Sequence, residues 1–161
     1  MTTELEAVLR QYNELFIGVI TMEELLAYAY LLENGFNVQK QYDIKLNELF
    51  INNPNDKDLL ELEIISGDTK KCICYIKTHI DYSNMNRSKF GKELMELLKP
   101  FYKSLSINTF GDRMYSLWES LAGNLQDEEP FFTLCYADDF ISWNENQARK
   151  KYEEMLSYYD N

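Results

Sequence analysis

The chain has 161 residues, of which 45% are hydrophobic and 14% aromatic, and its formal net charge at pH 7 is −11. This length accommodates one domain, or one domain with an appendage, and the composition excludes an intrinsically disordered chain. The acidic start lacks the basic and apolar regions of a secretion signal, and no apolar run approaches the roughly 18 to 20 residues of a membrane helix. We therefore expect a cytoplasmic protein that does not associate with membranes.

The acidic charge is unevenly distributed. Residues 1–58 carry −6, residues 59–108 carry +2, and residues 109–161 carry −7. Such a field repels nucleic acid and attracts basic proteins. Solubility alone is the competing explanation for an acidic composition. We expect a basic protein as partner and no direct binding of nucleic acid.

The N-terminal third predicts three helices. Gly18 interrupts the first helical pattern. Thr21 and Glu24 have the spacing of a capping box, so a second helix is expected to begin at Thr21. Gly35 is expected to end it. The three helices cover residues 3–17, 21–34 and about 43–51.

A loop rich in Asn, Asp and Pro follows at residues 52–58. This density of turn-forming residues marks the best candidate for a domain boundary. We expect a helical extension over residues 1–57 and a second domain over residues 58–161.

Two strands are expected at the start of the second domain. In residues 60–65 leucine and isoleucine alternate with glutamate, which is the period of a strand. Residues 72–80 are rich in β-branched and aromatic side chains. The turn at 66–71 would join them as an antiparallel hairpin. A continuous helix over 59–80 is the alternative, which the glycine in the turn opposes.

The last 75 residues or so predict three helices and one more strand. Pro100 lies within the first of these helices and should kink it or end it early. The apolar run from Pro130 to Ala137 suits a short buried strand. Ser142 and Glu145 match a capping box for the final helix. The helices cover about residues 88–104, 111–122 and 143–158.

The segment from Thr109 to Gly123 organises this half of the chain. Its apolar residues fall at i, i+4, i+7, i+8 and i+11, which is one stripe of a helix. Asp112 is expected near the positive end of the helix dipole, and Gly123 in a left-handed cap. The opposite face carries Tyr115 and Glu119 among small residues. The apolar stripe consists of Phe110, Met114, Leu117, Trp118 and Leu121.

Three cysteines are an odd number, which argues against a disulfide framework. On a strand, Cys72 and Cys74 would share a face, and we expect buried free thiols there. A metal site formed with Cys135 and His79 is the alternative. It is disfavoured because His79 would point to the opposite face of the same strand. No metal and no cofactor are expected.

Catalytic motifs were not found. The sequence has one histidine and contains no nucleophile elbow, phosphate-binding loop, dinucleotide fingerprint or zinc-binding helix motif. Only His79 could act as the base for a serine or cysteine nucleophile. The pairs Glu128/Glu129 and Asp138/Asp139 fall in expected surface loops, where solvation suffices to explain them. We therefore expect a protein that is not an enzyme.

The stretch Phe-Gly-Asp, Leu-Trp-Glu, Leu and Gly between Phe110 and Gly123 is followed by Pro130 and an apolar run. This pattern resembles the barstar family, the intracellular inhibitors of barnase-type ribonucleases. Residues 80–84 and the helix after them resemble that family's first strand and first helix. The resemblance covers about residues 72–161. It implies an α+β fold, in which a small sheet of about three strands packs with helices, and to which the N-terminal helical extension is added.

The resemblance also implies a mechanism. The family's second helix and the loop before it enter a ribonuclease active site, and carboxylates stand where the RNA phosphate would sit. By position, Glu119 would enter the site and Trp118 would pack at the base of the contact face. Ala122 and Gly123 would let the partner approach closely. At helical spacing, however, Trp118 also fits a simple core stripe.

Two positions differ from the family pattern. Tyr115 stands where the family has an acid, and Thr109 where it often has an aromatic residue. The expected function is an inhibitor or immunity protein that occludes the active site of a basic bacterial toxin other than barnase, such as a nuclease, in a 1:1 complex. The alternative is a regulatory module that binds proteins through its N-terminal helices. The expected partner-binding residues are Thr109, Asp112, Tyr115, Trp118, Glu119, Ala122 and Gly123.

Overall fold

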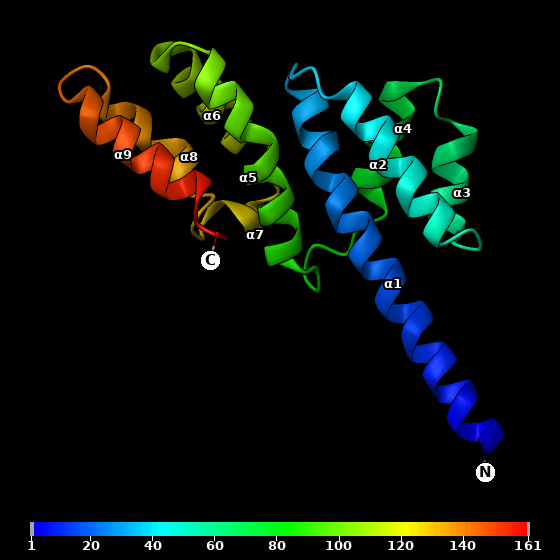
Figure 1. Ribbon diagram of the computed structural model, residues 1–161. Helices are drawn as coiled ribbons and strands as arrows, with labels where there is room; N and C mark the ends of the chain where they lie inside the picture. Colours follow the sequence, from blue (N-terminus) through cyan, green and yellow to red (C-terminus); the bar gives the residue numbers. More distant parts are fainter. Residues whose placement is uncertain (1, 161) are drawn as a thin grey trace.

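The computed structural model describes the backbone of residues 2–160 and the side chains of residues 4, 5, 7, 8 and 22–160. Every regular element in this part of the chain is helical, and it contains no strand (Figure 1). None of the described helices has both the length and the apolar character needed to span a bilayer. The elements are α1 (Thr2–Glu33), α2 (Gln39–Asn52), α3 (Lys57–Ile64), α4 (Thr69–Thr78), α5 (Arg87–Ser104), α6 (Ile107–Ser120), α7 (Gly123–Gln126), α8 (Thr133–Tyr136), the 3₁₀ helix η1 (Ala137–Phe140) and α9 (Glu145–Leu156).

The helices form two groups that share α1. The second half of α1 packs against α4 on one side and α5 on the other, and α2 and α3 complete the first group (Figure 1). In the second group, α6 packs against α8 and η1, and α9 packs against α5 and η1. One cluster of buried apolar side chains runs through both groups, and it includes Leu25, Leu46, Leu59, Leu94 and Leu117.

The predicted α+β fold is wrong, beginning with the strand expected at residues 60–65. Helix α3 buries Leu59 and Leu62, which lie three residues apart, and leaves Leu60 and Ile64 exposed. That spacing is helical and places the two buried leucines on one face. Asp56 caps the helix because its carboxylate accepts a hydrogen bond from the Leu59 N–H at 3.0 Å.

Helix α4 replaces the strand expected at residues 72–80. Cys72 and Ile76, four residues apart, are its buried positions. The Asp68 carboxylate accepts a hydrogen bond from the Lys71 N–H at 3.2 Å and caps the helix. A turn does separate the two elements, as predicted, so residues 57–78 form a helix–turn–helix rather than a hairpin of strands.

The remaining strand predictions are also wrong. The apolar run after Pro130 forms the single turn α8 and then η1, in which Thr133, Leu134 and Ala137 are buried. Residues 80–84, which the resemblance placed at the family's first strand, lie in the connection between α4 and α5, and the loop that the sequence predicts over residues 81–86 is present there. The fold implied by the resemblance is therefore absent from the described residues.

The predicted helical regions are confirmed in approximate place, with different boundaries, and the first two of them form one helix. Helix α1 runs without a break through Gly18 and Thr21, whose side chains lie outside the described set, so the expected break and cap are wrong. Glu24 instead forms ion pairs with Lys45 at 3.1 Å and Lys89 at 3.4 Å. Gly35 follows the end of α1 with φ of 81°, a conformation that favours glycine, as the sequence predicted.

Helices α2, α5 and α9 also lie close to their predicted ranges and differ from them in their boundaries or caps. Helix α5 continues to Ser104 past Pro100, so the proline does not end it early. Helix α9 is capped by Asn144, which accepts a hydrogen bond from the Gln147 N–H at 3.1 Å, and not by Ser142 as predicted. The predicted loop after α2 is present, and the buried cluster continues across it.

Candidate partner-binding surface

Helix α6 begins earlier than the sequence predicted. Ser106 is its N-cap and accepts a hydrogen bond from the Thr109 N–H at 3.2 Å. Asp112 therefore lies beyond the first turn, and its expected place at the positive end of the helix dipole is wrong. Gly123 does not cap the helix in a left-handed conformation either, because Leu121 is the C-cap and Gly123 begins α7.

The apolar stripe of α6 is confirmed. Phe110, Met114 and Leu117 are fully buried, and Leu121 is nearly so. The Phe110 ring meets Tyr152 edge to face, with ring centroids 5.0 Å apart. These contacts fix the rotation of the helix and therefore determine which residues face solvent.

The opposite side of α6 presents most of the predicted partner-binding residues. Thr109, Asp112, Tyr115 and Glu119 are all exposed, with 42% of the Tyr115 side chain accessible. Their helical spacing brings them onto one face of α6, which we call the α6 surface. Gly123 is exposed on the segment that follows, whereas Trp118 and Ala122 are half-buried.

Trp118 connects α6 to the segment after it. Its Nε1–H donates to the Gln126 carbonyl at 3.1 Å, and the Gln126 amide donates back to the Trp118 carbonyl at 3.0 Å. The Tyr115 ring lies beside the indole, with centroids 6.0 Å apart. The indole is thus held by α7 and supports Tyr115 from one side.

The C-terminal end of α6 is held by the end of α1. The Ala122 N–H donates to the Tyr30 hydroxyl at 3.2 Å. The Asn34 side-chain amide donates to the Ser120 hydroxyl at 3.0 Å and to the Tyr30 carbonyl at 2.7 Å. These contacts leave Glu119 exposed, so the front of the chain supports the α6 surface without covering it.

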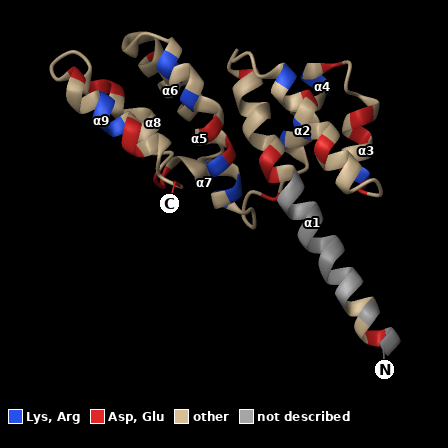
Figure 2. Cartoon of the chain, in the orientation of Figure 1, with Lys and Arg blue, Asp and Glu red and all other residues tan. Residues whose placement is uncertain are grey.

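The carboxylates of the α6 surface are not neutralised by described neighbours. Neither Asp112 nor Glu119 forms an ion pair with any described side chain. Arg113, the one base of α6, lies against the Phe36 ring at 4.7 Å from its centroid. Helix α9 carries three acidic and three basic residues and so adds no net charge (Figure 2), and residues 109–144 carry −6 of the −7 of the last third.

Asp138 is more buried than the sequence predicted. It lies against α6 at Gly111, and its Oδ1 is buried without a hydrogen-bond partner. Burial raises the pKa of Asp138, and the nearby carboxylates of Asp139 and Asp112 raise it further. Both residues lie in η1 rather than in a loop, and the predicted solvation is right for Asp139, which is exposed, and wrong for Asp138.

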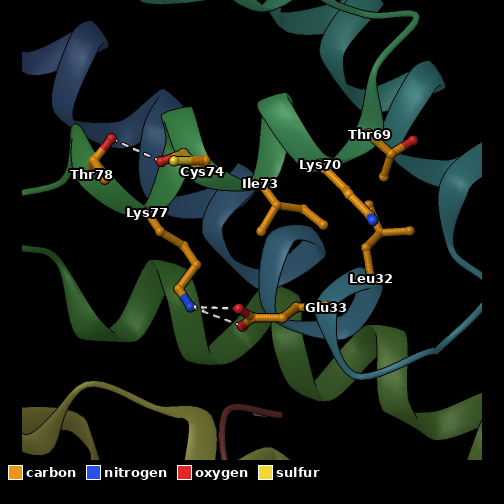
Figure 3. Close-up of a pocket in the computed structure, with 8 residues that line it drawn as sticks. All are labelled: Leu32, Glu33, Thr69, Lys70, Ile73, Cys74, Lys77 and Thr78. Carbon is orange, nitrogen blue, oxygen red and sulfur yellow. Dashed lines mark hydrogen bonds and ion pairs between the residues drawn. The ribbon is translucent and has the colours of Figure 1, made fainter.

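A cavity lies between the end of α1 and α4 (Figure 3). It has a volume of about 710 Å³ and is mainly apolar. The Lys77 ammonium pairs with Glu33 at 2.8 Å at its edge and lies over the Tyr30 ring. This cavity was not predicted, because α4 was expected to be a strand. Its lining residues are Leu32, Glu33, Thr69, Lys70, Ile73, Cys74, Lys77 and Thr78.

The cysteines do not gather. On helix α4 a spacing of two residues turns Cys72 into the core and Cys74 towards solvent, so the expected shared face is wrong. All three cysteines are free, as predicted, but only Cys72 is buried. In the described part of the chain, no three His, Cys, Asp or Glu side chains are grouped so that they could hold a metal ion.

Comparison of the chain with protein-family models, with curated proteins and with solved structures found no match.

Proposed function

We propose that this protein is a non-catalytic binder of a basic protein, and that the α6 surface forms part of the contact. The observation that carries the proposal is the exposure of Asp112, Tyr115 and Glu119 on one face of a helix whose other face is fully buried. A surface held in this way loses little conformational entropy when a partner binds.

The chemistry of the α6 surface favours a cationic partner. Carboxylates such as those of Asp112 and Glu119 form charge-assisted hydrogen bonds with arginine and lysine. Tyrosine is enriched among the residues that dominate binding energy, and Tyr115 stands between the two acids on α6. The overall charge of −11 would speed encounter with a basic protein and make the association rate sensitive to salt.

The specific form that we propose is inhibition of a basic toxin, such as a nuclease, by occlusion of its active site in a 1:1 complex. A cationic catalytic cleft is a surface to which exposed carboxylates and a tyrosine are complementary. The proposal rests on the α6 surface itself, since the barstar-like sheet is absent from the described residues.

The test uses the full chain co-expressed with the basic protein encoded by the adjacent reading frame, followed by calorimetric titration of the purified pair. Glu119→Lys places a positive charge on the α6 surface and is expected to weaken binding by about tenfold or more. Glu48→Lys is the matched control, because Glu48 is exposed on α2, which packs only against α1 and α3 among its main contacts. Equal losses of affinity in the two variants would show that the overall negative charge attracts the partner and that the α6 surface is not a specific contact.

A second candidate function is protein binding through the start of α1. Leu5 and Val8 are each 61% exposed and lie three residues apart on that helix. Leu5→Asp combined with Val8→Asp would abolish partner binding under this alternative and leave it intact under the α6 proposal. A truncation of residues 1–57 cannot make the distinction, because the second half of α1 belongs to the core.

A further inference from the structure

A second, smaller cavity lies where α1, α3 and the connection between α4 and α5 meet. Its volume is about 260 Å³, and three carboxylates line it, those of Glu23, Asp58 and Asp81. His79 and the apolar side chains of Met22 and Ile80 complete its main walls, and no lysine or arginine lines it. The α6 surface contributes no residue to this cavity.

Glu23 is the unusual residue in this cavity. Its side chain is only 3% exposed, and its Oε1 accepts a hydrogen bond from the Asn86 backbone N–H at the start of α5. Its Oε2 is buried and has no hydrogen-bond partner. Burial raises the pKa of Glu23, which the Asn86 N–H and the charge of Lys89 only partly oppose. A buried carboxylate oxygen in this state lacks the donor that such groups nearly always have.

Lys89, whose charge acts on Glu23, forms its ion pair with another acid. The Lys89 ammonium lies 3.4 Å from the carboxylate of Glu24, the neighbour of Glu23 in sequence. Lys45 also pairs with Glu24, at 3.1 Å. Lys45 and Lys89 therefore form ion pairs with Glu24, and the Oε2 atom of Glu23 has no cationic partner.

The other acids of the cavity are held in place by hydrogen bonds. Asp58 accepts a hydrogen bond from the Tyr75 hydroxyl at 2.8 Å. Asp81 accepts hydrogen bonds from the Ser83 hydroxyl at 2.6 Å and the Asn84 amide at 2.8 Å, and these bonds lower its pKa. Asp81 is therefore ionised at neutral pH and adds negative charge at the mouth of the cavity.

His79 adds an acceptor. Its ring is stacked on Tyr75 with centroids 3.8 Å apart, and its Nδ1 lies 2.8 Å from the Tyr75 carbonyl oxygen. A carbonyl oxygen can only accept, so Nδ1 carries the proton in this contact, and in the neutral ring Nε2 is then an acceptor. The polar wall of the cavity thus consists mainly of acceptors.

We propose that this cavity binds an ammonium or guanidinium group, and that the Oε2 atom of Glu23 is its main acceptor. The acceptors are spread around the cavity rather than gathered on one point, since no three of the described acids and His79 are close enough to hold a metal ion. A cation with several N–H donors matches such an arrangement. The group could be the side chain of a lysine or arginine from a protein, or a small free amine.

The test measures binding of methylguanidinium and methylammonium to the full chain by NMR, with tetramethylammonium, which has no N–H donor, as the control cation. We expect saturable binding of the first two and a shift of the Asn86 amide resonance, because that N–H is bonded to Glu23. Tetramethylammonium should bind at least tenfold more weakly. Absence of saturable binding, or equal binding of tetramethylammonium, would overturn the proposal.

Two variants locate the acceptor. Glu23→Gln removes the charge and replaces one oxygen by a donor, so it should weaken methylguanidinium binding about tenfold or more. Glu48→Gln is the control, because Glu48 carries the same charge, is exposed on α2 and does not line this cavity; a change of less than about twofold is expected. Equal losses in the two variants would overturn the assignment. If Glu23→Gln does not fold, Asp58→Asn provides the second variant, and unchanged binding in it would likewise count against the site.

A blocked Gly-Arg-Gly peptide and spermidine distinguish the two sources of the cation. Binding of the peptide at least as tight as that of methylguanidinium supports a protein side chain as the occupant. Binding of spermidine and methylguanidinium without the peptide supports a free amine. The α6 variant Glu119→Lys should leave all these affinities unchanged, so failure of this proposal and failure of the proposed function are separate results.

Discussion

The α6 surface and the Glu23 cavity are both acidic, and they differ in how much water reaches the carboxylates. Asp112 and Glu119 are exposed, so water and salt screen them, and they act mainly on encounter and at a contact with a partner. Glu23 is 3% exposed, and one of its oxygens has no partner. Burial, more than charge count, therefore distinguishes the two regions, because a buried carboxylate interacts more strongly with a nearby charge than a screened one does.

The two regions are also supported differently. The α6 surface rests on fully buried apolar side chains, among them Met114 and Leu117. The cavity wall at residues 79–85 is held by polar contacts, in which the Tyr82 hydroxyl donates to the Lys77 carbonyl at 2.8 Å and the Asn124 amide donates to the Tyr82 carbonyl at 2.6 Å. We therefore expect stability to respond strongly to core changes under α6 and weakly to changes at its exposed face.

The largest effect is expected for the support of the α6 surface. Leu117→Ala removes a fully buried side chain and should lower the free energy of unfolding by about 2–5 kcal/mol. Tyr115→Ala, on the exposed face of the same helix, should cost less than about 1 kcal/mol. Urea denaturation followed by circular dichroism measures both. Similar costs for the two variants would mean that α6 is rotated relative to the described structure.

A smaller effect is expected where α6 meets η1. Gly111→Ala places a Cβ 2.7 Å from Ile141 Cδ1 and 3.1 Å from Asp138 Cβ, so the end of the Ile141 side chain has to shift and Asp138 has to give slightly. The cost is about 1–3 kcal/mol, reduced by up to roughly 1 kcal/mol through the better helix propensity of alanine. Gly123→Ala is the control, because no heavy atom lies within 4 Å of its added Cβ. A Gly111→Ala variant as stable as Gly123→Ala would contradict the close packing of α6 on η1.

The smallest effect is expected at Glu23, and it depends on pH. Because the pKa of Glu23 is raised in the folded state above its ordinary value of 4.5, the folded protein binds more protons between those two values. The contribution of Glu23 to stability is therefore greatest at low pH and decreases as pH rises through the folded pKa. Glu23→Gln should remove this decrease and be at least as stable as the unaltered chain at pH 7.

Urea denaturation between pH 4 and pH 8 measures this difference, with Glu24→Gln as the comparison. Glu24 pairs with Lys45 and Lys89, so its replacement should lower stability at pH 7 instead of raising it. The pKa of Asp138 is raised too and contributes a fall of the same sign in both proteins. A Glu23→Gln variant with the same pH profile as the unaltered chain would contradict the buried, unpartnered state of Glu23.

Helices α1, α2, α5, α6 and α9 and the apolar stripe of α6 could be predicted from sequence because a 3.6-residue period extends over several turns in each. The three short apolar runs could not be assigned in this way. In α3 the buried pair is Leu59 and Leu62, but Leu60, Leu62 and Ile64 also alternate along the chain, and only packing against α2 decides between the two patterns. Runs of four to eight apolar residues fit a buried strand and a buried helix equally well.

Of the candidate sites, the exposed face of α6 was predictable and the Glu23 cavity was not. Exposure of Tyr115 and Glu119 follows from their position opposite the apolar stripe. Glu23 lies beside Glu24 at a place where the sequence shows only a capping box. Glu23 differs from Glu24 because its carboxylate accepts a hydrogen bond from the backbone N–H of Asn86. Asn86 lies 63 residues further along the chain, so no local sequence pattern predicts this contact.

The central position of α1 has a consequence for synthesis. Its second half, with Leu25, Leu26 and Leu31 fully buried, is made first, but its partner α5 is complete only about 70 residues later. At roughly 5–20 residues per second, the ribosome takes about 4–14 s to add them. During that interval α2 and then α4 cover only part of the apolar side of α1, so the rate of translation sets how long the nascent chain is open to aggregation and to chaperones.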